Sequence, residues 1–269
     1  MNNFADLKIV VRGAGDLATG VALRLYRSGF RRLLLLETEH PLAVRRLVSF
    51  SEAINIGKVS IEGITARRID DVEMLGQWPS DTTIPIVVDP AGESIRKLRP
   101  DIVIDAIIAK RNLGTTIDDA ELVIGLGPGF SAGRDVDCVI ETQRGHHLGR
   151  VIWDGGAAPD TGIPGNIGGY STERLLRAPN PGIFTTGCNI GDTVEEGQCM
   201  AKVDSSPVCA NISGVIRGLL RSATPVDRGT KLGDIDPRGK VTFCTTASDK
   251  AMAVGGGVLE AILNNFIYR

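Results

Sequence analysis

The chain has 269 residues, and its 30 lysine and arginine residues nearly balance 32 aspartate and glutamate residues, so the formal net charge is −2. A chain of this length forms one large domain or two ordinary ones and can bury a substantial core. The balanced charge gives no long-range field that would attract nucleic acid or an anionic membrane, so neither is expected as a partner. The 33 glycines, beside 42% hydrophobic residues, exclude a disordered chain and indicate turns and binding loops.

Targeting and redox signals are weak. The sequence contains no apolar run of membrane-spanning length, and its first residues lack the basic and apolar regions of a signal peptide. We therefore expect a soluble, cytoplasmic protein. The five cysteines form no C-x-x-C pair, so disulfide bonds are not expected in a reducing compartment, and no ligand spacing predicts a metal site.

The first 37 residues have the pattern of a βαβ unit. A β-branched strand at 7–11 leads into a glycine-rich turn, and apolar residues then recur at helical spacing from Leu17 to Tyr26, with Gly29 closing the helix. A second apolar strand at 33–36 ends at Glu37. The turn contains G-x-G-x-x-A, and the carboxylate follows at the distance typical of a dinucleotide-binding unit.

Each residue of this turn has an expected role in cofactor binding. Gly13 permits the tight turn, Gly15 lets a pyrophosphate approach the backbone, and Ala18 allows close helix packing, with Thr19 in the same segment. Glu37 is expected to accept a hydrogen bond from a ribose 2′-OH. Asp16 would repel a pyrophosphate, an effect that Arg12 could offset. The alternative is a glycine turn that only packs a helix tightly.

Further apolar runs predict a larger sheet. Strands are expected at 84–88, 101–109 and 122–126, and a short helix at 93–99 stops before Pro100. Together they predict a Rossmann-like parallel sheet whose strand ends bring Lys110, Arg111, Gly127 and Gly129 toward the glycine turn. Lys110 and Arg111 would then bind a phosphate or carboxylate, although two charges after a strand are equally consistent with a solvated turn. The pair His146-His147 is expected in a surface turn.

The second half contains an internal repeat. The segment 194–197 recurs 32 residues later at 226–229, with Val and Gly at matching ends. Short β runs around these turns predict a small β-rich barrel like a lipoyl or biotinyl domain. Such domains carry their cofactor on a lysine between the two halves, where this chain has 204–208 without lysine. Lys202 precedes that turn, so no covalent cofactor is expected.

A helix is expected from Asp249 to about Asn264, with Ser248 as its N-cap. Its three consecutive glycines at 255–257 weaken a helix, so we expect them to pack closely on the first domain or a ligand. The predicted domains are 1–165 (a Rossmann-like nucleotide-binding domain), 166–245 (the β domain) and 246–269 (the C-terminal helix).

Several segments together resemble the YqeB-type proteins of the selenium-dependent molybdenum hydroxylase system. The segments that carry the resemblance are 11–20, 105–112, 127–130, 137–142 and 146–152, together with the β domain. The glycine turn is also similar to the Rossmann part of xanthine dehydrogenase accessory factors. The resemblance implies an accessory factor in hydroxylase maturation, with the hydroxylase apoenzyme as partner. It supplies no catalytic residue.

Three functions remain open at this point. The first is a maturation factor that binds a nucleotide or the nucleotide of the molybdenum cofactor, either as a monomer or as a homo-oligomer. The second is an NAD(P)-dependent oxidoreductase, for which no Tyr-x-x-x-Lys pair is present. The third is a nucleotide-responsive scaffold without activity.

The cysteines offer one more hypothesis, that a thiolate carries selenium or sulfur. Cys138 alternates with apolar residues beside Asp137, and Cys188 lies in a polar turn without a basic neighbour. Reactive thiolates need nearby positive charge and exposure, so inert structural thiols are the preferred interpretation. We predict that no cysteine of this chain is strongly acidic.

Overall fold

The computed structural model describes residues 4–75 and 83–267. The chain divides into two compact units. Unit 1 comprises residues 1–41, 49–160 and 247–269, and unit 2 comprises residues 42–48 and 161–246. The chain thus leaves unit 1 twice and returns to it for the last helix.

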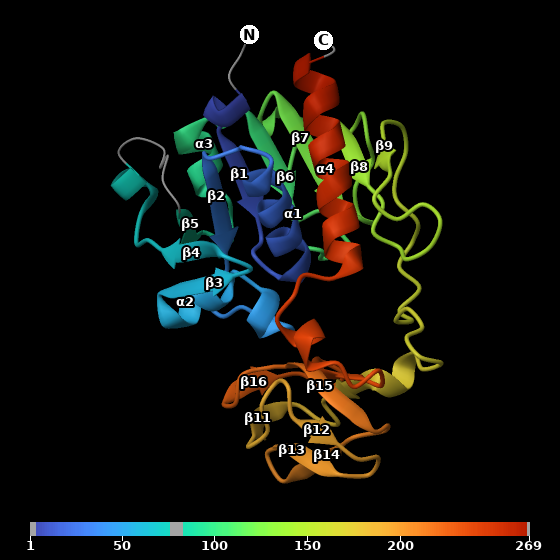
Figure 1. The fold of residues 1–269 in the computed structure, drawn as a ribbon. Coiled ribbons are helices and arrows are strands. Elements are labelled where there is room, and N and C mark those ends of the chain that lie inside the picture. The colour runs from blue at the N-terminus through green and yellow to red at the C-terminus, as the bar shows by residue number, and fades with distance from the viewer. Residues whose placement is uncertain (1–3, 76–82, 268–269) are drawn as a thin grey trace. The chain divides into compact units, whose positions relative to one another are not determined.

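Unit 1 contains four helices and nine strands among its described residues (Figure 1). The helices are α1 (Asp16–Arg27), α2 (Glu52–Ile56), α3 (Glu93–Leu98) and α4 (Asp249–Ile267). The strands are β1 (Ile9–Arg12), β2 (Leu33–Glu37), β3 (Lys58–Ile61), β4 (Ile64–Arg68), β5 (Thr83–Val88), β6 (Ile102–Asp105), β7 (Leu122–Leu126), β8 (Cys138–Ile140) and β9 (Val151–Ile152). Short 3-10 turns are η1 (Phe4–Asp6), η3 (Val72–Leu75) and η4 (Ile117–Asp119).

These strands form one mixed sheet in the order β3-β4-β5-β2-β1-β6-β7-β8-β9. Neighbours from β4 to β8 pair in parallel, whereas β3 and β9 pair antiparallel at the two edges. The central strands are apolar on both faces because helices cover both faces; in β1, for example, Ile9, Val10 and Val11 are fully buried.

The expected Rossmann-like parallel sheet is therefore wrong as a fold class, because the sheet is mixed. The antiparallel edge at β3 arises from a two-residue turn, in which Glu62 and Gly63 both have positive φ, of 47° and 84°. Such a turn reverses the chain into a hairpin and so cannot join parallel strands. The sequence analysis did not anticipate this hairpin.

Helices α1 and α4 lie side by side on one face of the sheet (Figure 1). They meet at small residues: a Cβ on Gly20 would lie 2.6 Å from the Cβ of Ala251, and a Cβ on Gly255 would lie 2.9 Å from the oxygen of Gly20. A Cβ on Gly257 would lie still closer, 2.1 Å from the oxygen of Gly149, whereas a Cβ on Gly256 would meet no atom within 4 Å. Two of the three consecutive glycines are thus explained by close packing within unit 1.

Unit 2 consists of short strands and 3-10 turns. Its strands are β10 (Leu175–Arg177), β11 (Gly182–Thr186), β12 (Thr193–Val194), β13 (Cys199–Val203), β14 (Ser206–Cys209), β15 (Gly214–Leu219), β16 (Thr224–Val226) and β17 (Lys231–Asp236). Its 3-10 turns are η2 (Arg46–Val48), η5 (Thr172–Arg174) and η6 (Val241–Cys244). The strands form two antiparallel sheets, β10-β17-β15-β12 and β14-β13-β11-β16.

The internal repeat predicted from the sequence is present in this topology. The repeat makes β10, β11, β12 and β13 equivalent to β14, β15, β16 and β17, in that order. When each strand is exchanged with its equivalent, the order of one sheet becomes the order of the other. Gly197 and Gly229, 32 residues apart, have φ of 81° and 84° and donate equivalent hydrogen bonds of 2.8 Å to Ala210 and Ala178. The expected lipoyl-like barrel is nevertheless wrong, because strand pairing in the described residues gives two separate sheets rather than a closed ring.

Most elements predicted in unit 1 occur close to their expected bounds, including α1, β2, β7 and α4. Ser248 caps α4 as expected, since its hydroxyl accepts a hydrogen bond from the Ala251 N–H. The strand predicted at 101–109 is wrong in length, because β6 stops at Asp105. Ile108 and Lys110 then have φ near 60°, which ends the extended chain in spite of its apolar composition.

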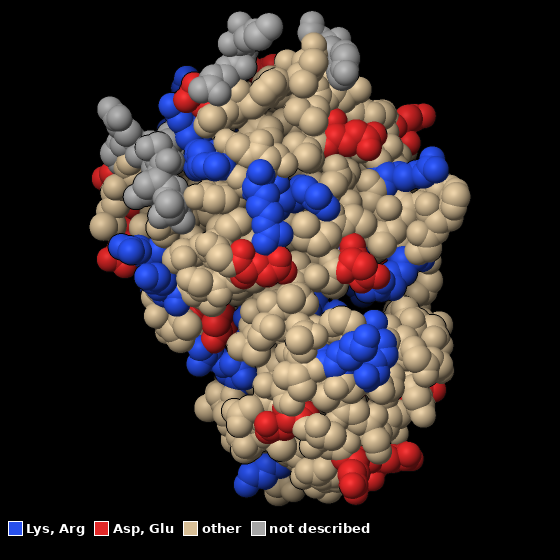
Figure 2. All heavy atoms as spheres, viewed as in Figure 1, with Lys and Arg blue, Asp and Glu red and all other residues tan. Residues whose placement is uncertain are grey.

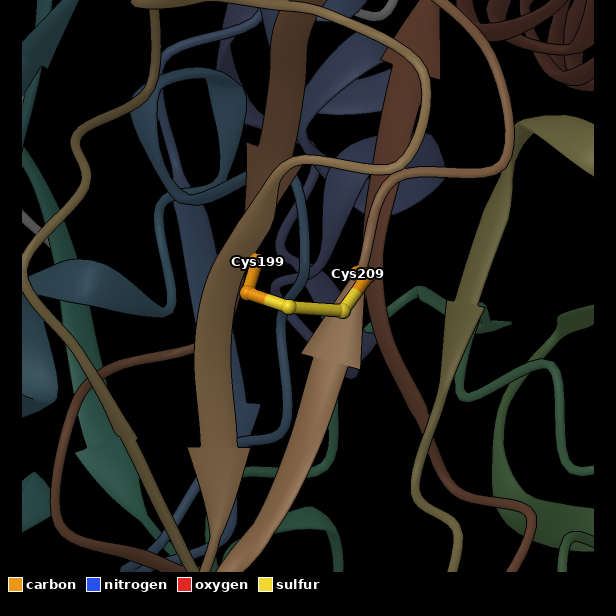
Figure 3. The surroundings of a disulfide bond; sticks show 2 residues. All are labelled: Cys199 and Cys209. Carbon is orange, nitrogen blue, oxygen red and sulfur yellow. A yellow bond between two sulfur atoms is a disulfide. The ribbon is translucent and has the colours of Figure 1, made fainter.

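The expectation that no disulfide bond forms is also wrong. Cys199 and Cys209 are joined by a disulfide that links β13 to β14 (Figure 3). Strand register is the physical reason, because it places the two residues directly opposite each other. The sequence spacing of ten residues gave no C-x-x-C signal.

Candidate functional site

The glycine turn after β1 is held between β2 and β6. Gly13 has φ of 95°, and a Cβ there would lie 2.9 Å from the carbonyl oxygen of Ala106, so only glycine fits. Its N–H donates to the oxygen of Leu36 at 2.7 Å. Gly15 is the N-cap of α1, supplies no capping side chain, and has open space where a Cβ would be. The turn therefore leaves room for a ligand at the start of α1.

Glu37 fixes this turn. Its Oε2 accepts a hydrogen bond from the Ala14 N–H at 2.9 Å, and its Oε1 accepts one from the Thr38 N–H at 2.8 Å. A carboxylate oxygen has a second lone pair, so a ribose hydroxyl could still bind. The first function of Glu37 in this structure is nevertheless to hold the turn.

Ala18 and Thr19, predicted as cofactor-binding residues, are fully buried on α1. The Thr19 hydroxyl accepts a hydrogen bond from the Phe50 N–H at 2.8 Å and donates to the oxygen of Ala14 at 3.3 Å. Both residues therefore support the turn from the buried side of α1. Asp16 lies in the first turn of the same helix.

The predicted residues after β6 and β7 come together as two packed loops. A Cβ on Gly129 would lie 2.6 Å from the backbone nitrogen of Arg111, and Gly127 packs as closely on the hydroxyl of Thr142. Lys110 is exposed and forms an ion pair with Asp160. These loops share the sheet edge with the glycine turn, because β1, β6 and β7 are parallel neighbours. The side chain of Lys110, however, is directed to Asp160.

Arg12 does not serve to offset Asp16, as the sequence suggested. It is only 3% exposed, and its guanidinium lies 3.5 Å from Asp105, which is 2% exposed. Arg12 also donates to the Thr115 hydroxyl and to the oxygen of Leu113, while Thr115 donates to Asp105 at 2.6 Å. This buried network ties the end of β1 to the end of β6.

A cavity of about 210 Å³ opens beside this network. Its lining includes Arg12, Gly92, Arg96 and Gly114. Asp89 shapes the adjoining loop, because its carboxylate accepts hydrogen bonds from the backbone of Gly92 and two following residues. Burial acts to raise the pKa of Asp89, but these hydrogen bonds hold it below its ordinary value. The sequence analysis did not anticipate this cavity.

Lys250 is the cation that sequence reasoning missed. It lies in the first turn of α4, one residue before Ala251, which packs on Gly20 of α1. Burial lowers the pKa of Lys250, and the nearby Arg144 lowers it further, while the carboxylates of Asp16, Glu141 and Asp160 act in the opposite direction. A half-buried ammonium group therefore lies near the start of α1. No sequence motif identified it, because it depends on how α4 packs.

Helices α1 and α4 run parallel, since contacts advance in the same direction along both. Gly20 meets Ala251, and one turn later the Arg24 guanidinium donates to the oxygen of Met252 at 3.1 Å while its Cβ meets Gly255. Their N-termini consequently lie at the same sheet edge. Each contributes a partial positive charge there, which favours an anionic ligand.

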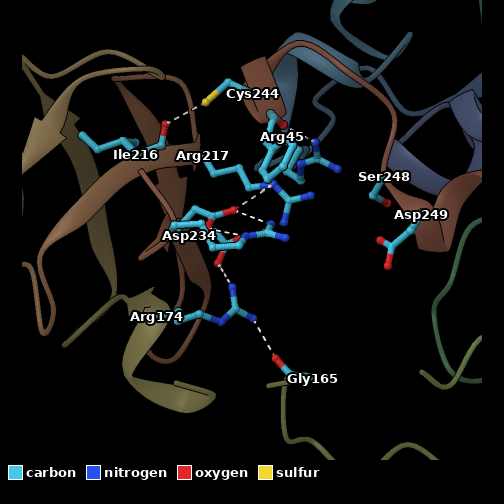
Figure 4. Close-up of polar contacts among 12 residues, drawn as sticks. Arg45, Gly165, Arg174, Ile216, Arg217, Asp234, Cys244, Ser248 and Asp249 are labelled. Atoms are coloured by element: carbon cyan, nitrogen blue, oxygen red, sulfur yellow. Dashed lines mark hydrogen bonds and ion pairs between the residues drawn. The ribbon is translucent and has the colours of Figure 1, made fainter. Parts of the chain in front are cut away.

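Unit 2 has a buried charged cluster of a different kind (Figure 4). Arg174 donates to Asp234 at 2.6 Å and to the oxygen of Gly165 at 3.1 Å. Arg217 lies 4.0 Å from Asp234 and 3.8 Å from Asp236. These buried charges are paired with one another within and beside β15 and β17, so the removal of one partner would leave an uncompensated charge in the sheet.

Two of the free thiols, those of Cys138 and Cys244, agree with the expectation of inert cysteines. Burial and the neighbouring Asp137 raise the pKa of Cys138 to about 12, and burial raises the pKa of Cys244. Cys188 is half-buried, and its acidity stays a prediction. Among the described residues, His, Cys, Asp and Glu form no group of three or more that could hold a metal ion.

No family model matches the chain. The uncharacterized protein YqeB of Escherichia coli (strain K12) is 48% identical to the chain over 255 residues, which cover 95% of the chain. This relative supports the YqeB-type family. The chain spans about half of that relative's length (47%), so the activity and partners of a whole YqeB-type protein do not transfer to it directly.

Solved structures resemble the chain only remotely. TcdA (CsdL) has a TM-score of 0.34 and 15% identity, covering 97% of this chain and 88% of that one. Ectoine utilization protein EutE (DoeB) from Ruegeria pomeroyi has a TM-score of 0.26 and 10% identity, covering 87% and 86%. An aspartoacylase family protein from Mesorhizobium loti MAFF303099 has a TM-score of 0.25 and 12% identity, covering 79% and 58%. These low scores carry no argument about fold or function.

Basic and acidic side chains are interspersed over the face shown in Figure 2, in line with the balanced composition. Among residues 4–75 and 83–267, no helix combines the length and apolarity that crossing a membrane requires.

Proposed function

We propose that unit 1 binds a nucleotide, or a cofactor that carries a nucleotide, at the N-terminus of α1. The observation that supports this most is the open space at Gly15, next to a helix start that has no capping side chain. A phosphate placed there would accept hydrogen bonds from backbone N–H groups and meet the positive end of the helix.

Lys250 supplies charge complementarity for this ligand. The carboxylate of Asp16 in the first turn of α1 opposes an anion, and the ammonium group of Lys250 interacts electrostatically with that carboxylate. A phosphate would gain from the cation and from the two parallel helix N-termini. The Arg12 network keeps the ends of β1 and β6 together beneath the turn, so the site is preorganised.

The wider role that we propose is that of an accessory factor in the maturation of a selenium-dependent molybdenum hydroxylase, acting in the cytoplasm. This role rests on the family resemblance of the sequence, because the YqeB relative is itself uncharacterized. The hydroxylase apoenzyme would be the partner. An NAD(P)-dependent oxidoreductase is less favoured, because the sequence contains no Tyr-x-x-x-Lys pair that could transfer a proton.

Substitution of Gly15 tests the binding site. Gly15→Val should abolish nucleotide binding in calorimetry with NAD, NADP, ATP and CTP, because its side chain occupies the phosphate space. The fold should survive, since φ at Gly15 is −68° and no atom lies within 4 Å of an added Cβ. Gly187→Val in unit 2 is the matched control, because Gly187 also has open space.

Two outcomes would remove the proposal: wild-type chain that binds none of these nucleotides, or Gly15→Val chain that binds as wild type does. Mass spectrometry of the molecule that copurifies with the wild-type chain would identify the natural ligand. The maturation role is tested separately, by measuring hydroxylase activity in cells from which the gene for this chain has been deleted. Unchanged activity there would reject the role and leave the binding site standing.

A further inference from the structure

The disulfide of unit 2 lies at the surface. Cys199 is exposed at the start of β13, and Cys209 is half-buried at the end of β14 (Figure 3). Neither belongs to the hydrophobic core of unit 2, which is formed on the same strands by Met200, Val203 and Val208. A small thiol in solution can therefore reach one sulfur without opening the core.

The internal repeat shows that this strand pair does not need a disulfide. The positions equivalent to Cys199 and Cys209 are Lys231 and Arg177, and these two residues also face each other, on β17 and β10. Both strand pairs contain a register shift beside this position. The same backbone arrangement is thus built once with a disulfide and once with two cations.

Hydrogen bonds hold the two strands on both sides of the disulfide. On one side the Ala210 N–H donates to the oxygen of Gln198 at 2.9 Å, and the Gly197 N–H donates to the oxygen of Ala210 at 2.8 Å. On the other side the register continues through Ala201 opposite Val208. Reduction of the disulfide would therefore leave the hairpin paired.

We propose that Cys199 and Cys209 form a reversible thiol–disulfide exchange site whose substrate is a low-molecular-mass thiol. Exposed disulfides are more readily reduced than structural ones, and the repeat indicates that this one is dispensable for the fold. The site is independent of the nucleotide site of unit 1 and involves none of its residues.

The exchange proceeds in two balanced steps. The thiolate of the small thiol attacks Sγ of Cys199, the more exposed residue of the pair. The Cys199–Cys209 bond breaks, and Cys209 leaves as a thiolate that takes a proton from solvent. A second thiolate attacks the outer sulfur of the mixed disulfide, which releases Cys199 as a thiolate that is also protonated. The two small thiols lose two electrons as they form one disulfide, and the cysteine pair gains these two electrons as it becomes a dithiol.

A redox titration of the whole chain tests this proposal. The chain is equilibrated in buffers of reduced and oxidised glutathione, quenched with acid, alkylated with N-ethylmaleimide and mapped by mass spectrometry. Cys199 and Cys209 should change together from disulfide to dithiol across these buffers, with native circular dichroism at both ends. A disulfide that persists in the most reducing glutathione buffer, or one that never forms in excess oxidised glutathione, would overturn the proposal.

Serine variants test the order of attack and the dispensability of the bond. Cys209→Ser leaves the exposed Cys199, whose thiolate should attack oxidised glutathione, release one reduced glutathione and form a mixed disulfide faster than Cys199→Ser, which leaves the half-buried Cys209. Equal rates would contradict attack at Cys199. Cys188→Ser is the control and should titrate as wild type. If the double variant Cys199→Ser/Cys209→Ser lost the fold of unit 2, the disulfide would be structural and the proposal would fail.

Discussion

The two units place their buried charged side chains differently. In unit 1, Arg12 and Asp105 are the last residues of β1 and β6, so they lie where the strands stop and loops begin. In unit 2, Arg217 and Asp234 lie inside β15 and β17, in the middle of a sheet. Both sets of charges are paired, but Arg12 also lines a cavity at the strand ends, in the region where parallel sheets bind their ligands.

The repeat in unit 2 sharpens this difference. Asp234 is buried between Arg174 and Arg217, but its counterpart 32 residues earlier is Lys202, which is exposed on β13. The counterpart of Arg217 is Thr185, and Thr185 and Lys202 both line an open groove. The same arrangement of strands thus carries a buried charged cluster in one sheet and an open groove in the other. The difference lies in the side chains at equivalent positions.

The largest expected effect comes from breaking the ion pairs of unit 2. Asp234→Ala would leave the buried guanidinium groups of Arg174 and Arg217 without this carboxylate, so it should cost about 3–5 kcal/mol of unfolding free energy. Lys202→Ala at the equivalent exposed position should change it by less than about 0.5 kcal/mol. Urea unfolding followed by circular dichroism measures both. Equal effects would mean that the two sheets do not differ as described.

A smaller effect should follow from the glycines that join α1 and α4 to their neighbours. A Cβ at Gly257 would lie 2.1 Å from the oxygen of Gly149, so Gly257→Ala should cost about 1–3 kcal/mol through overpacking. Gly256 has no atom within 4 Å, and Gly256→Ala should stabilise the helix by up to about 1 kcal/mol. Urea midpoints of the two variants should therefore move in opposite directions. A shift of both in the same direction would disprove close backbone packing at Gly257.

The smallest effect concerns Lys250 and pH. Burial lowers the pKa of Lys250 in the folded chain, whereas the unfolded chain keeps a value of about 10.4. Between these two values the unfolded state binds the extra proton, so stability should rise with pH in that window. Lys250→Met should remove this rise, and at neutral pH it should be at least as stable as wild type.

The exposed Lys97 provides the control, because Lys97→Met should retain the wild-type slope. Unfolding free energies measured by urea at several pH values decide the matter. An unchanged slope in Lys250→Met would show that another group is responsible.

Local patterns predicted the parts of the fold that local interactions determine. The succession of β1, α1 and β2 could be predicted from the sequence because strand, glycine turn and helix follow one another without interruption. The offset of 32 residues correctly indicated a repeat, although the two open sheets were wrongly expected to form a barrel. The hairpin of β3 and β4 was missed because Glu62 adopts a positive φ, a conformation that the residue type glutamate does not predict.

The candidate site was predictable only in part. The glycine spacing located the turn, in which the backbone requires glycine at Gly13, whereas Thr19 is fully buried and holds the turn from within unit 1. Lys250 reaches the site through the packing of α4, and the pairing of Cys199 with Cys209 depends on strand register. Contacts between residues far apart in the sequence leave no local signal. The repeat relates Cys199 and Cys209 to Lys231 and Arg177, and these two residues also face each other across two strands.

The return of the chain to unit 1 has a consequence for the order of synthesis. Unit 1 needs α4 on α1, yet residues 161–246 are translated between its last loop and that helix. At about 5–20 residues per second, the ribosome delivers all of unit 2 before α4 exists. Until then, the face of α1 that carries Gly20 has no partner helix. Residues 161–246 are therefore synthesised first, and the α1 N-terminus acquires its Lys250 neighbour only after they have been translated.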